Sequence, residues 1–215
     1  MSRNNGGAGI DSWSWGVGRG ISAEGNISDG IILREGYTLT ESTSRGNGGV
    51  GINSFSWGVG RGITSEGNAS DGFVLGAGSE LIECTSRGNG SLGVRVIDDN
   101  SPAKTSNCVS EGNGLDGFKV GAGSTVTGCV ARSNGTTGDG AGIRVMGSGS
   151  RIEGNQVLLN DWGITLSGSG NLVIRNSASG NTSGNYYIAS GNAAGPVAST
   201  LDVATTTNPN ANFEY

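Results

Sequence analysis

Short runs that alternate between apolar and polar residues recur along the whole chain, and each run begins just after a glycine. The first apolar positions of these runs are Ile10, Ile31, Ile52, Phe73, Val94, Phe118, Ile143 and Ile164. A second inward position follows two residues later, as in Leu33, Leu75 and Val120. Alternation with a period of two is typical of a half-buried β-strand. The pattern therefore predicts many short strands, each with one face toward an interior.

The runs are spaced at a nearly fixed interval, and an asparagine precedes each of them. These asparagines are Asn5, Asn26, Asn47, Asn68, Asn89, Asn113, Asn134, Asn160 and Asn181, and the steps between them are 21 residues except for one of 24 and one of 26. Residues 2–43 and 44–85 also align without a gap, with 27 identities in 42 positions. A fixed period of this size predicts a solenoid, in which each repeat buries its apolar face only by stacking on its neighbours.

Three short strands separated by glycine-rich corners fit into each 21-residue turn. We therefore predict an all-β fold, a right-handed single-stranded parallel β-helix of about nine coils. The β-helix is expected to occupy residues 1–191, and residues 192–215 are expected to form a terminal cap strand and a tail. Extra residues within 97–104, in coil five, and around 136–141 break the period, and insertions of this kind form loops.

The period places like side chains above one another. Amides stacked at strand spacing can hydrogen-bond along the stack, so we expect an internal asparagine ladder that includes Asn26, Asn47, Asn68, Asn89, Asn113 and Asn134. Two residues before each anchor asparagine, Arg and Glu alternate from Arg3 to Arg132, and these charges are expected to form a row of ion pairs in water. Cys84, Cys108 and Cys129 also share one column, and we expect buried thiols there, with one disulfide as the alternative.

Composition and charge narrow the classes of partner. Gly accounts for 43 of 215 residues without a period of three, which excludes collagen. The net charge is −5 and the 13 basic residues form no cluster, so nucleic acid is not an expected partner. No apolar run approaches the ~18 residues of a transmembrane span, so we expect no membrane insertion. The repeat begins at Ser2, so a signal peptide is expected to be absent from this sequence.

The run from Gly117 to Cys129, with its Gly-Phe-x-Val, Gly-Ser-x-Val and Gly-Cys segments, resembles the right-handed parallel β-helix repeats of the pectate-lyase-like superfamily. The resemblance covers about residues 2–188 and is greatest to uncharacterised secreted bacterial members. It implies an extracellular, bacterial-type location. The superfamily includes polysaccharide lyases, glycoside hydrolases, phage tailspikes and proteins with no known activity, so the resemblance predicts the fold and leaves the function open.

Candidate catalytic and metal-binding groups are few. The chain has no His, which removes Ser-His or Cys-His nucleophiles and His-metal sites. Asp29, Asp71 and Asp116 recur at one corner on every second coil, roughly 9.6 Å apart, which is too far for one shared Ca²⁺, and we expect them to form Asx turns. Residues 6–14 match a calcium-binding nonapeptide once. That motif works in tandem, so we expect no cofactor, with Ca²⁺ as the alternative.

Four aromatic residues occupy two shared registers on alternate coils, namely Trp13, Trp15, Phe55 and Trp57. They are interpreted in three ways: as filling for wide corners beside glycine, as stacking surfaces for sugar rings, or as a protein interface. From this we expect a non-catalytic extracellular β-helix scaffold that binds carbohydrate or a surface, with polysaccharide as the partner.

The alternative function is a lyase or hydrolase that acts on an acidic polysaccharide at the coil-five loop. Its candidate catalytic residues are Asp98, Asp99, Lys104 and Arg95. Adjacent carboxylates on an extended strand point to opposite faces, so Asp98 and Asp99 converge only if the loop bends. A third hypothesis is head-to-tail self-association through an uncapped N-terminal coil.

Overall fold

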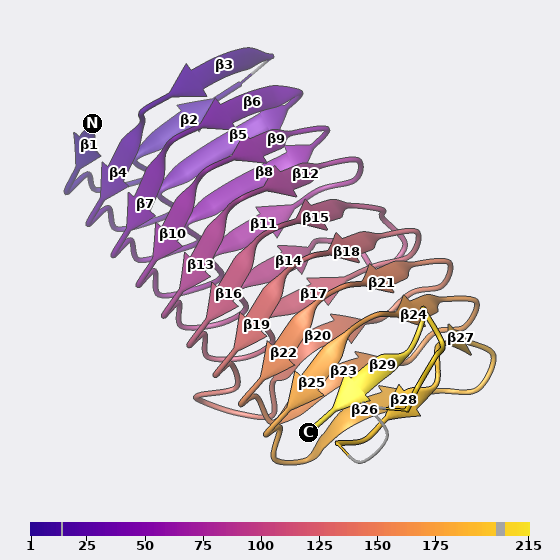
Figure 1. Cartoon of the computed structure of the whole chain (residues 1–215). Helices are drawn as coiled ribbons and strands as arrows, with labels where there is room; N and C mark the ends of the chain where they lie inside the picture. Colours follow the sequence, from indigo (N-terminus) through magenta and orange to yellow (C-terminus); the bar gives the residue numbers. More distant parts are fainter. Residues whose placement is uncertain (14, 201–204) are drawn as a thin grey trace.

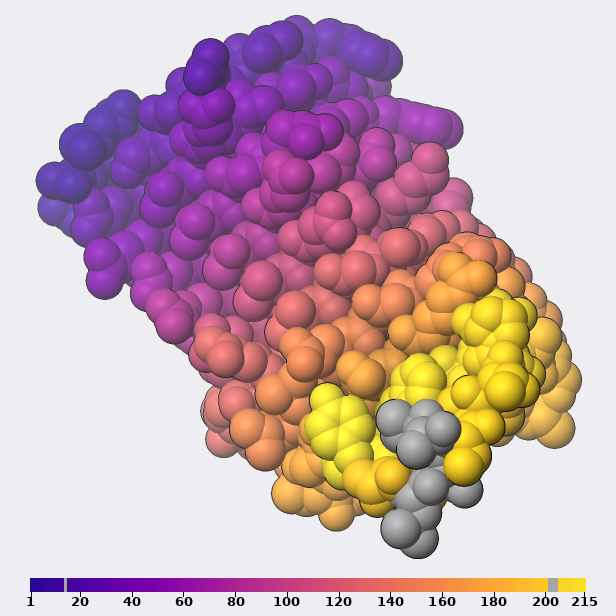
Figure 2. Space-filling view, viewed as in Figure 1, coloured from indigo at the N-terminus to yellow at the C-terminus, as the bar shows by residue number. Residues whose placement is uncertain are grey.

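Three parallel β-sheets, stacked coil upon coil, make up the computed structural model, which describes residues 1–13, 15–200 and 205–215. The coils stack into a rod that runs from the indigo N-terminal coil at the top to the yellow C-terminal end at the bottom, and successive coils appear as parallel bands on its surface (Figures 1 and 2). Within the described residues every strand pair is parallel and no helix occurs, so none could span a membrane. The predicted β-solenoid is confirmed.

Sheet A holds the strands that carry the alternating Arg and Glu residues. It runs in the order β1 (Ser2–Arg3), β4 (Ser22–Glu24), β7 (Thr43–Arg45), β10 (Thr64–Glu66), β13 (Thr85–Arg87), β16 (Val109–Glu111), β19 (Val130–Arg132), β22 (Gln156–Leu158), β25 (Ser177–Ser179), β29 (Asn212–Glu214) and β28 (Val197–Ala198).

Sheets B and C contain nine strands each, one from every coil. Sheet B contains β2 (Ile10–Ser12), β5 (Ile31–Glu35), β8 (Ile52–Ser56), β11 (Phe73–Leu75), β14 (Val94–Val96), β17 (Phe118–Val120), β20 (Ala141–Val145), β23 (Trp162–Leu166) and β26 (Gly184–Ile188). Sheet C contains β3 (Gly16–Arg19), β6 (Tyr37–Thr40), β9 (Val59–Arg61), β12 (Glu80–Ile82), β15 (Lys104–Ser106), β18 (Thr125–Thr127), β21 (Arg151–Glu153), β24 (Leu172–Ile174) and β27 (Ala193–Ala194).

The predicted columns meet in register along the rod. Ile52, Phe73 and Val94 pair directly across β8, β11 and β14, and their side chains are buried. The core is therefore a thin file of Ile, Val, Leu and Phe that each coil shares with the next, as expected from the low apolar content. Of the segment 192–215, β27 continues sheet C, while β28 and β29 continue sheet A, and residues 201–204 lie outside the described part.

The asparagine ladder is present as predicted. Asn47 Nδ2 donates to Asn68 Oδ1 at 2.8 Å, and the same bond repeats without a break from Asn5 to Asn181. Each Oδ1 also accepts the backbone N–H of the asparagine one coil earlier, for example Asn47 N at 3.1 Å. The buried amides are thus hydrogen-bonded on both sides, which makes their burial favourable.

The cysteine column is a second file of the same kind at the corner between sheets C and A. Cys84 N donates to Cys108 Sγ and Cys108 N donates to Cys129 Sγ, both at 3.4 Å, and Cys129 N donates to Asn155 Oδ1 at 2.8 Å. All three cysteines are buried free thiols. Hydrogen bonds to the neighbouring thiols, together with burial, raise the pKa of Cys108. The thiols therefore serve as apolar fillers that also accept a backbone N–H.

The charged row on sheet A forms close pairs only in part. Arg and Glu alternate in register as predicted, for example Glu66 opposite Arg45 and Arg87. The contacts within 4 Å are Arg3–Glu24, Arg45–Glu66, Arg87–Glu111 and Arg132–Glu111. All are solvent-exposed or partly exposed, so each contributes little to stability by itself.

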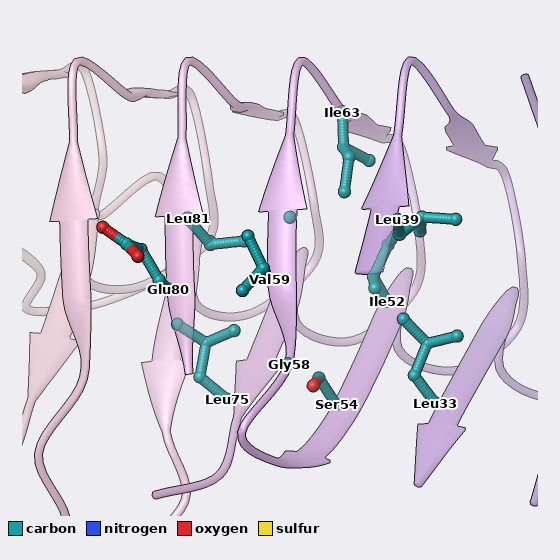
Figure 3. A pocket seen from close by; sticks show the side chains of 11 residues that line it. Leu33, Leu39, Ile52, Ser54, Gly58, Val59, Ile63, Leu75, Glu80 and Leu81 are labelled. Carbon is teal, nitrogen blue, oxygen red and sulfur yellow. The ribbon is translucent and has the colours of Figure 1, made fainter. Parts of the chain in front are cut away.

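Coil three has a small internal cavity. There Ser54 occupies the inward place that Leu33 and Leu75 hold in the neighbouring coils (Figure 3). Together with Gly58 and Gly60 it leaves a cavity of about 10 Å³. The Ser54 hydroxyl is buried and has no hydrogen-bond partner among the described residues. In coil three, the small residues Ser54, Gly58 and Gly60 therefore lie close in sequence to the large outward residues Phe55 and Trp57.

Candidate functional site

The four aromatic residues predicted from the sequence all lie on the outside of the rod, at the corner between sheets B and C. We call Trp13, Trp15, Phe55 and Trp57 the aromatic platform. Their side chains are 76%, 74%, 41% and 65% exposed. Phe55 and Trp57 belong to coil three and have coils on both sides, so these two residues are not exposed merely because they lie at an end of the rod.

Two tryptophans of the platform, Trp15 and Trp57, each lie on a glycine of the next coil. A Cβ added to Gly36 would collide with Cδ2, Cε3 and Cζ3 of Trp15, and a Cβ added to Gly78 would collide with the same three atoms of Trp57. The six-membered ring of each indole therefore rests against the backbone of the rod. This alternation of Trp and Gly gives a physical reason for the 42-residue repeat, because one 21-residue coil carries the indole and the next carries the glycine against which the indole rests.

Trp57 has a backbone conformation that bulky residues rarely adopt. Its φ is 55°, in the left-handed region, and Gly36 and Gly78 have φ values of 56° and 72° in the same file. A non-glycine residue held in this region costs on the order of 1–3 kcal/mol. Coil three therefore holds an exposed indole at a position where the coils on either side have glycine.

An arginine lies between the two aromatic residues of the other file. Arg34 Cζ is 4.0 Å from the centroid of the Trp13 ring and 5.6 Å from that of Phe55. Asp11 holds it from one side, accepting from Arg34 Nε at 3.1 Å and from Nη2 at 2.9 Å. Hydrogen bonding to Asp11 raises the pKa of the Arg34 guanidinium. The platform is thus an aromatic surface with one fixed cation whose charge Asp11 balances.

Arg34 was not predicted as part of the site, although the sequence contains the signal. It lies 21 residues after Trp13 and 21 before Phe55, so the period alone places it between them. The neutralisation of Asp11 also bears on the calcium-binding nonapeptide. Both oxygens of Asp11 accept hydrogen bonds from Arg34, and Ser14 lies outside the described residues.

The structure does not gather the candidate catalytic residues of the coil-five loop around one point. Arg95 lies on sheet B and donates to Asp71 at 2.6 Å, whereas Lys104 lies on sheet C. Asp98 Oδ1 accepts the N–H of Asn100, and the main-chain oxygen of Asp99 accepts the N–H of Ala122. Both aspartates are exposed, and their loop lies against the corner of the next coil.

The coil-five loop and the aromatic platform share one hollow. Trp57, Glu80, Pro102 and Lys104 line a depression of about 220 Å³ at the edge of sheet C. Glu80 and Lys104 are opposite one another in neighbouring strands but form no ion pair within 4 Å among the described residues. The platform is therefore continuous with the loop on its C-terminal side.

The prediction that Asp29, Asp71 and Asp116 form Asx turns is wrong. Each carboxylate instead reaches to the next coil and accepts a backbone N–H there, from Val50, Leu92 and Ala141 at 2.7–3.0 Å. Asp71 and Asp116 also bind Arg95 and Arg144 respectively. These carboxylates, of which Asp71 and Asp116 are buried, tie coils together. No group of three or more His, Cys, Asp or Glu side chains suited to a metal ion occurs in the described residues.

A comparison with families of known proteins finds that a model of the right-handed β-helix region matches residues 6–157 and 72–202. No curated protein matches the chain.

Among solved structures, the chain is similar to the A-module of mannuronan C-5 epimerase AlgE6 from Azotobacter vinelandii, with a TM-score of 0.67 and 20% identity over 87% of this chain and 58% of that one. The A-module of epimerase AlgE4 from the same organism gives 0.57 and 18%, covering 77% and 55% of the two chains. Pectate lyase Pel9A gives 0.55 and 13%, covering 88% and 64%.

At these identities the likeness to solved structures shows the fold alone, and this chain spans less than two thirds of each of them. The family model, in contrast, covers most of the sequence. Together with the three stacked parallel sheets, this match shows that the chain belongs to the right-handed β-helix family and has the fold of the pectate-lyase-like superfamily.

Proposed function

We propose that this protein is a non-catalytic β-helix that binds polysaccharide on its aromatic platform. The observation that carries the proposal is Trp57. It is 65% exposed, rests on Gly78 and holds a left-handed backbone that its neighbours in the file leave to glycine. Strained residues of this kind persist where the surrounding structure holds them in place, and they cluster at ligand-binding positions. An extracellular location is part of the same proposal.

The exposure of the platform favours stacking of a ligand over simple filling of the corner. A filler side chain buries most of its surface, since burial of apolar area is what makes it favourable. Trp57 instead presents about two thirds of its surface to solvent, while the ring rests on the rod. A flat indole held in this way suits the apolar face of a sugar ring. Its fixed rotamer also lowers the entropy cost of binding.

The fold neighbours support a polysaccharide as the class of ligand. The names of the similar structures give mannuronan and pectate as what those proteins act on. Both are polysaccharides, and both proteins have the same stacked-coil fold at low identity. The likeness concerns fold, so it supports the class of ligand and carries no residue role to this chain.

The test is binding to a panel of immobilised neutral and acidic polysaccharides, with the variant Trp57→Gly beside the unchanged protein. Glycine is the residue that coils two and four hold at this place, so the variant keeps the local backbone. We expect retention on at least one polysaccharide and loss of at least tenfold in affinity with Trp57→Gly. Tyr187→Ala, which removes a 56% exposed aromatic ring from coil nine, is the control and is expected to bind normally.

Analysis of the polysaccharide after incubation with the protein distinguishes the enzymatic alternative from the non-catalytic proposal. Reducing ends or unsaturated products from an acidic polysaccharide, lost on Lys104→Ala, would contradict the non-catalytic proposal.

Head-to-tail association through the N-terminal coil stays a prediction, and light scattering over a concentration series tests it.

A further inference from the structure

Two features of the platform specify its ligand more narrowly: the spacing of its indoles along the rod, and the sign of the unpaired charges around them. From these we infer that the ligand is a linear, uncharged glycan that lies parallel to the rod axis and stacks on Trp15 and Trp57 together. This inference rests on the proposed function and adds the chemical class and the direction of the ligand.

The direction follows from register. Trp15, Gly36, Trp57 and Gly78 are successive members of one file, and the indoles of coils one and three rest on the glycines of coils two and four. Coils stack at about 4.8 Å, so the two indoles lie about 9.6 Å apart along the axis. That spacing is on the scale of a disaccharide. A chain that follows the axis can therefore stack on both indoles, whereas a chain that crosses the rod meets one.

The second file of the platform strengthens the same direction. Trp13, Arg34 and Phe55 form a continuous stack along the axis, parallel to the indole file. The hollow that begins at Trp57 continues toward Pro102 and Lys104 in coil five. The surface available to a ligand is therefore elongated along the rod over coils one to five.

The charges around the platform oppose an acidic polymer. Arg34 is balanced by Asp11, so it offers no net positive charge. Two further carboxylates border the platform and its hollow, and neither forms an ion pair among the described residues. Glu35 is opposite Ser56, between Phe55 and Trp57, and Glu80 lines the hollow. Lys104 is the unpaired cation in the same hollow, so two negative charges and one positive charge give −1. A polyuronate would bring like charge to this surface, whereas an uncharged glycan meets no such repulsion.

The test is a titration by tryptophan fluorescence with oligosaccharides of increasing length. The probes are neutral gluco-, manno- and xylo-oligosaccharides, and oligogalacturonates of matched lengths. We expect at least one neutral series to show a step of about tenfold or more in affinity once the chain reaches from Trp15 to Trp57, because the second contact is then intramolecular. Matched uronates should bind about tenfold more weakly at low salt, and added salt should narrow the gap.

Variants separate the two parts of the inference. In Trp15→Gly the step with length should vanish while short neutral chains still bind at Trp57, and Tyr187→Ala should leave the step intact. Equal affinity for all lengths would overturn the axial arrangement, and tighter binding of uronates would overturn the neutral class, both with the proposed function left standing. Binding that is unchanged by both Trp15→Gly and Trp57→Gly would remove the proposed function itself.

Discussion

At the level of single residues, the corners of the rod decide which side chains the repeat can hold. Each of the three corners has a file of residues with positive φ. Glycine is the commonest residue in the whole set, and seven of the non-glycine members are Asn4, Glu41, Glu83, Asn107, Ser133, Leu159 and Arg175. Trp57 is the aromatic member of the set. The left-handed backbone turns the chain sharply and aims the residue outward, which is why a large side chain here ends in solvent.

A pair of substitutions at this position isolates the backbone strain. Trp57→Ala and Trp57→Gly both remove the indole, and they differ only in whether the residue tolerates φ near 55°. We expect Trp57→Gly to have a free energy of unfolding about 1 kcal/mol higher than Trp57→Ala. Urea unfolding of the two variants checks this. An alanine variant as stable as the glycine variant would mean that the conformation carries no strain.

The role of a residue could be predicted from the sequence where it depends only on the residues one period before and after it. The asparagines, the cysteines and the outward aromatics each follow from the 21-residue period, because neighbours in a column are neighbours in space. The aspartates at the corner were misread, since a local turn and a bond to the next coil look alike in sequence. Only the placement of Val50, Leu92 and Ala141 one coil away distinguishes them.

At the level of elements, the ladders hold the corners between short strands together. Strands of three residues offer few main-chain bonds, so the buried side chains at the corners supply the rest. Asn68 illustrates the arrangement. Its Nδ2 donates to Asn89 Oδ1 at 2.9 Å and to Ser65 Oγ at 3.0 Å, and its Oδ1 accepts from Asn47. One side chain thus connects three successive coils.

Removing one ladder amide should therefore be costly in the middle of the rod and cheap at its first coil. Asn68→Ala leaves several buried polar groups without partners, and we expect a loss of about 2–4 kcal/mol in the free energy of unfolding. Asn5→Ala is the matched control. Asn5 is exposed and donates to Asn26 alone within the ladder, so its loss should cost less than about 1 kcal/mol. Equal losses at both positions would argue against a cooperative ladder.

The last coil is tied to the C-terminal strand by a partly buried tyrosine. The hydroxyl of Tyr186 on β26 lies 3.0 Å from both Asn176 O and Phe213 O, and these two carbonyl oxygens share its one proton. Burial, with a contribution from Glu214, raises the pKa of Tyr186. The folded state therefore holds this proton more tightly than the unfolded state does. The resulting stabilisation is fully present below the ordinary tyrosine pKa of about 10 and is lost as the pH rises above it.

We accordingly expect the stability of the protein to fall above about pH 10, and Tyr186→Phe to flatten this part of the pH profile. Chemical unfolding measured from neutral to alkaline pH gives the slope. Tyr187→Phe, which changes the exposed ring beside it, should leave the slope as it is. A Tyr186→Phe profile as steep as that of the unchanged protein would assign the alkaline loss to other groups.

At the level of the whole molecule, the repeat fixes almost everything about the fold and little about the function. Stacking of coils, the three sheets and the shared core follow from the period, because a solenoid has only nearest-neighbour contacts. The coil-five loop could not be placed in the same way, since its inserted residues have no counterpart in the neighbouring coils. Its contact with Trp57 through a shared hollow emerged only from the three-dimensional arrangement.

The two-coil alternation gives the molecule a direction as well as a shape. Indoles, glycines and unpaired carboxylates lie along one edge of the rod over coils one to five, while coils six to nine carry glycine at the places equivalent to Trp57. We therefore expect ligand contact to be confined to the N-terminal part of the rod.

Oxidative footprinting of the four tryptophans, read by mass spectrometry with and without a saturating neutral polysaccharide, tests this account most directly. The account predicts fast oxidation of Trp13, Trp15 and Trp57 in the free protein, protection of Trp15 and Trp57 by the ligand, and no change at the half-buried Trp162. Ligand binding that leaves Trp15 and Trp57 as reactive as before would contradict it.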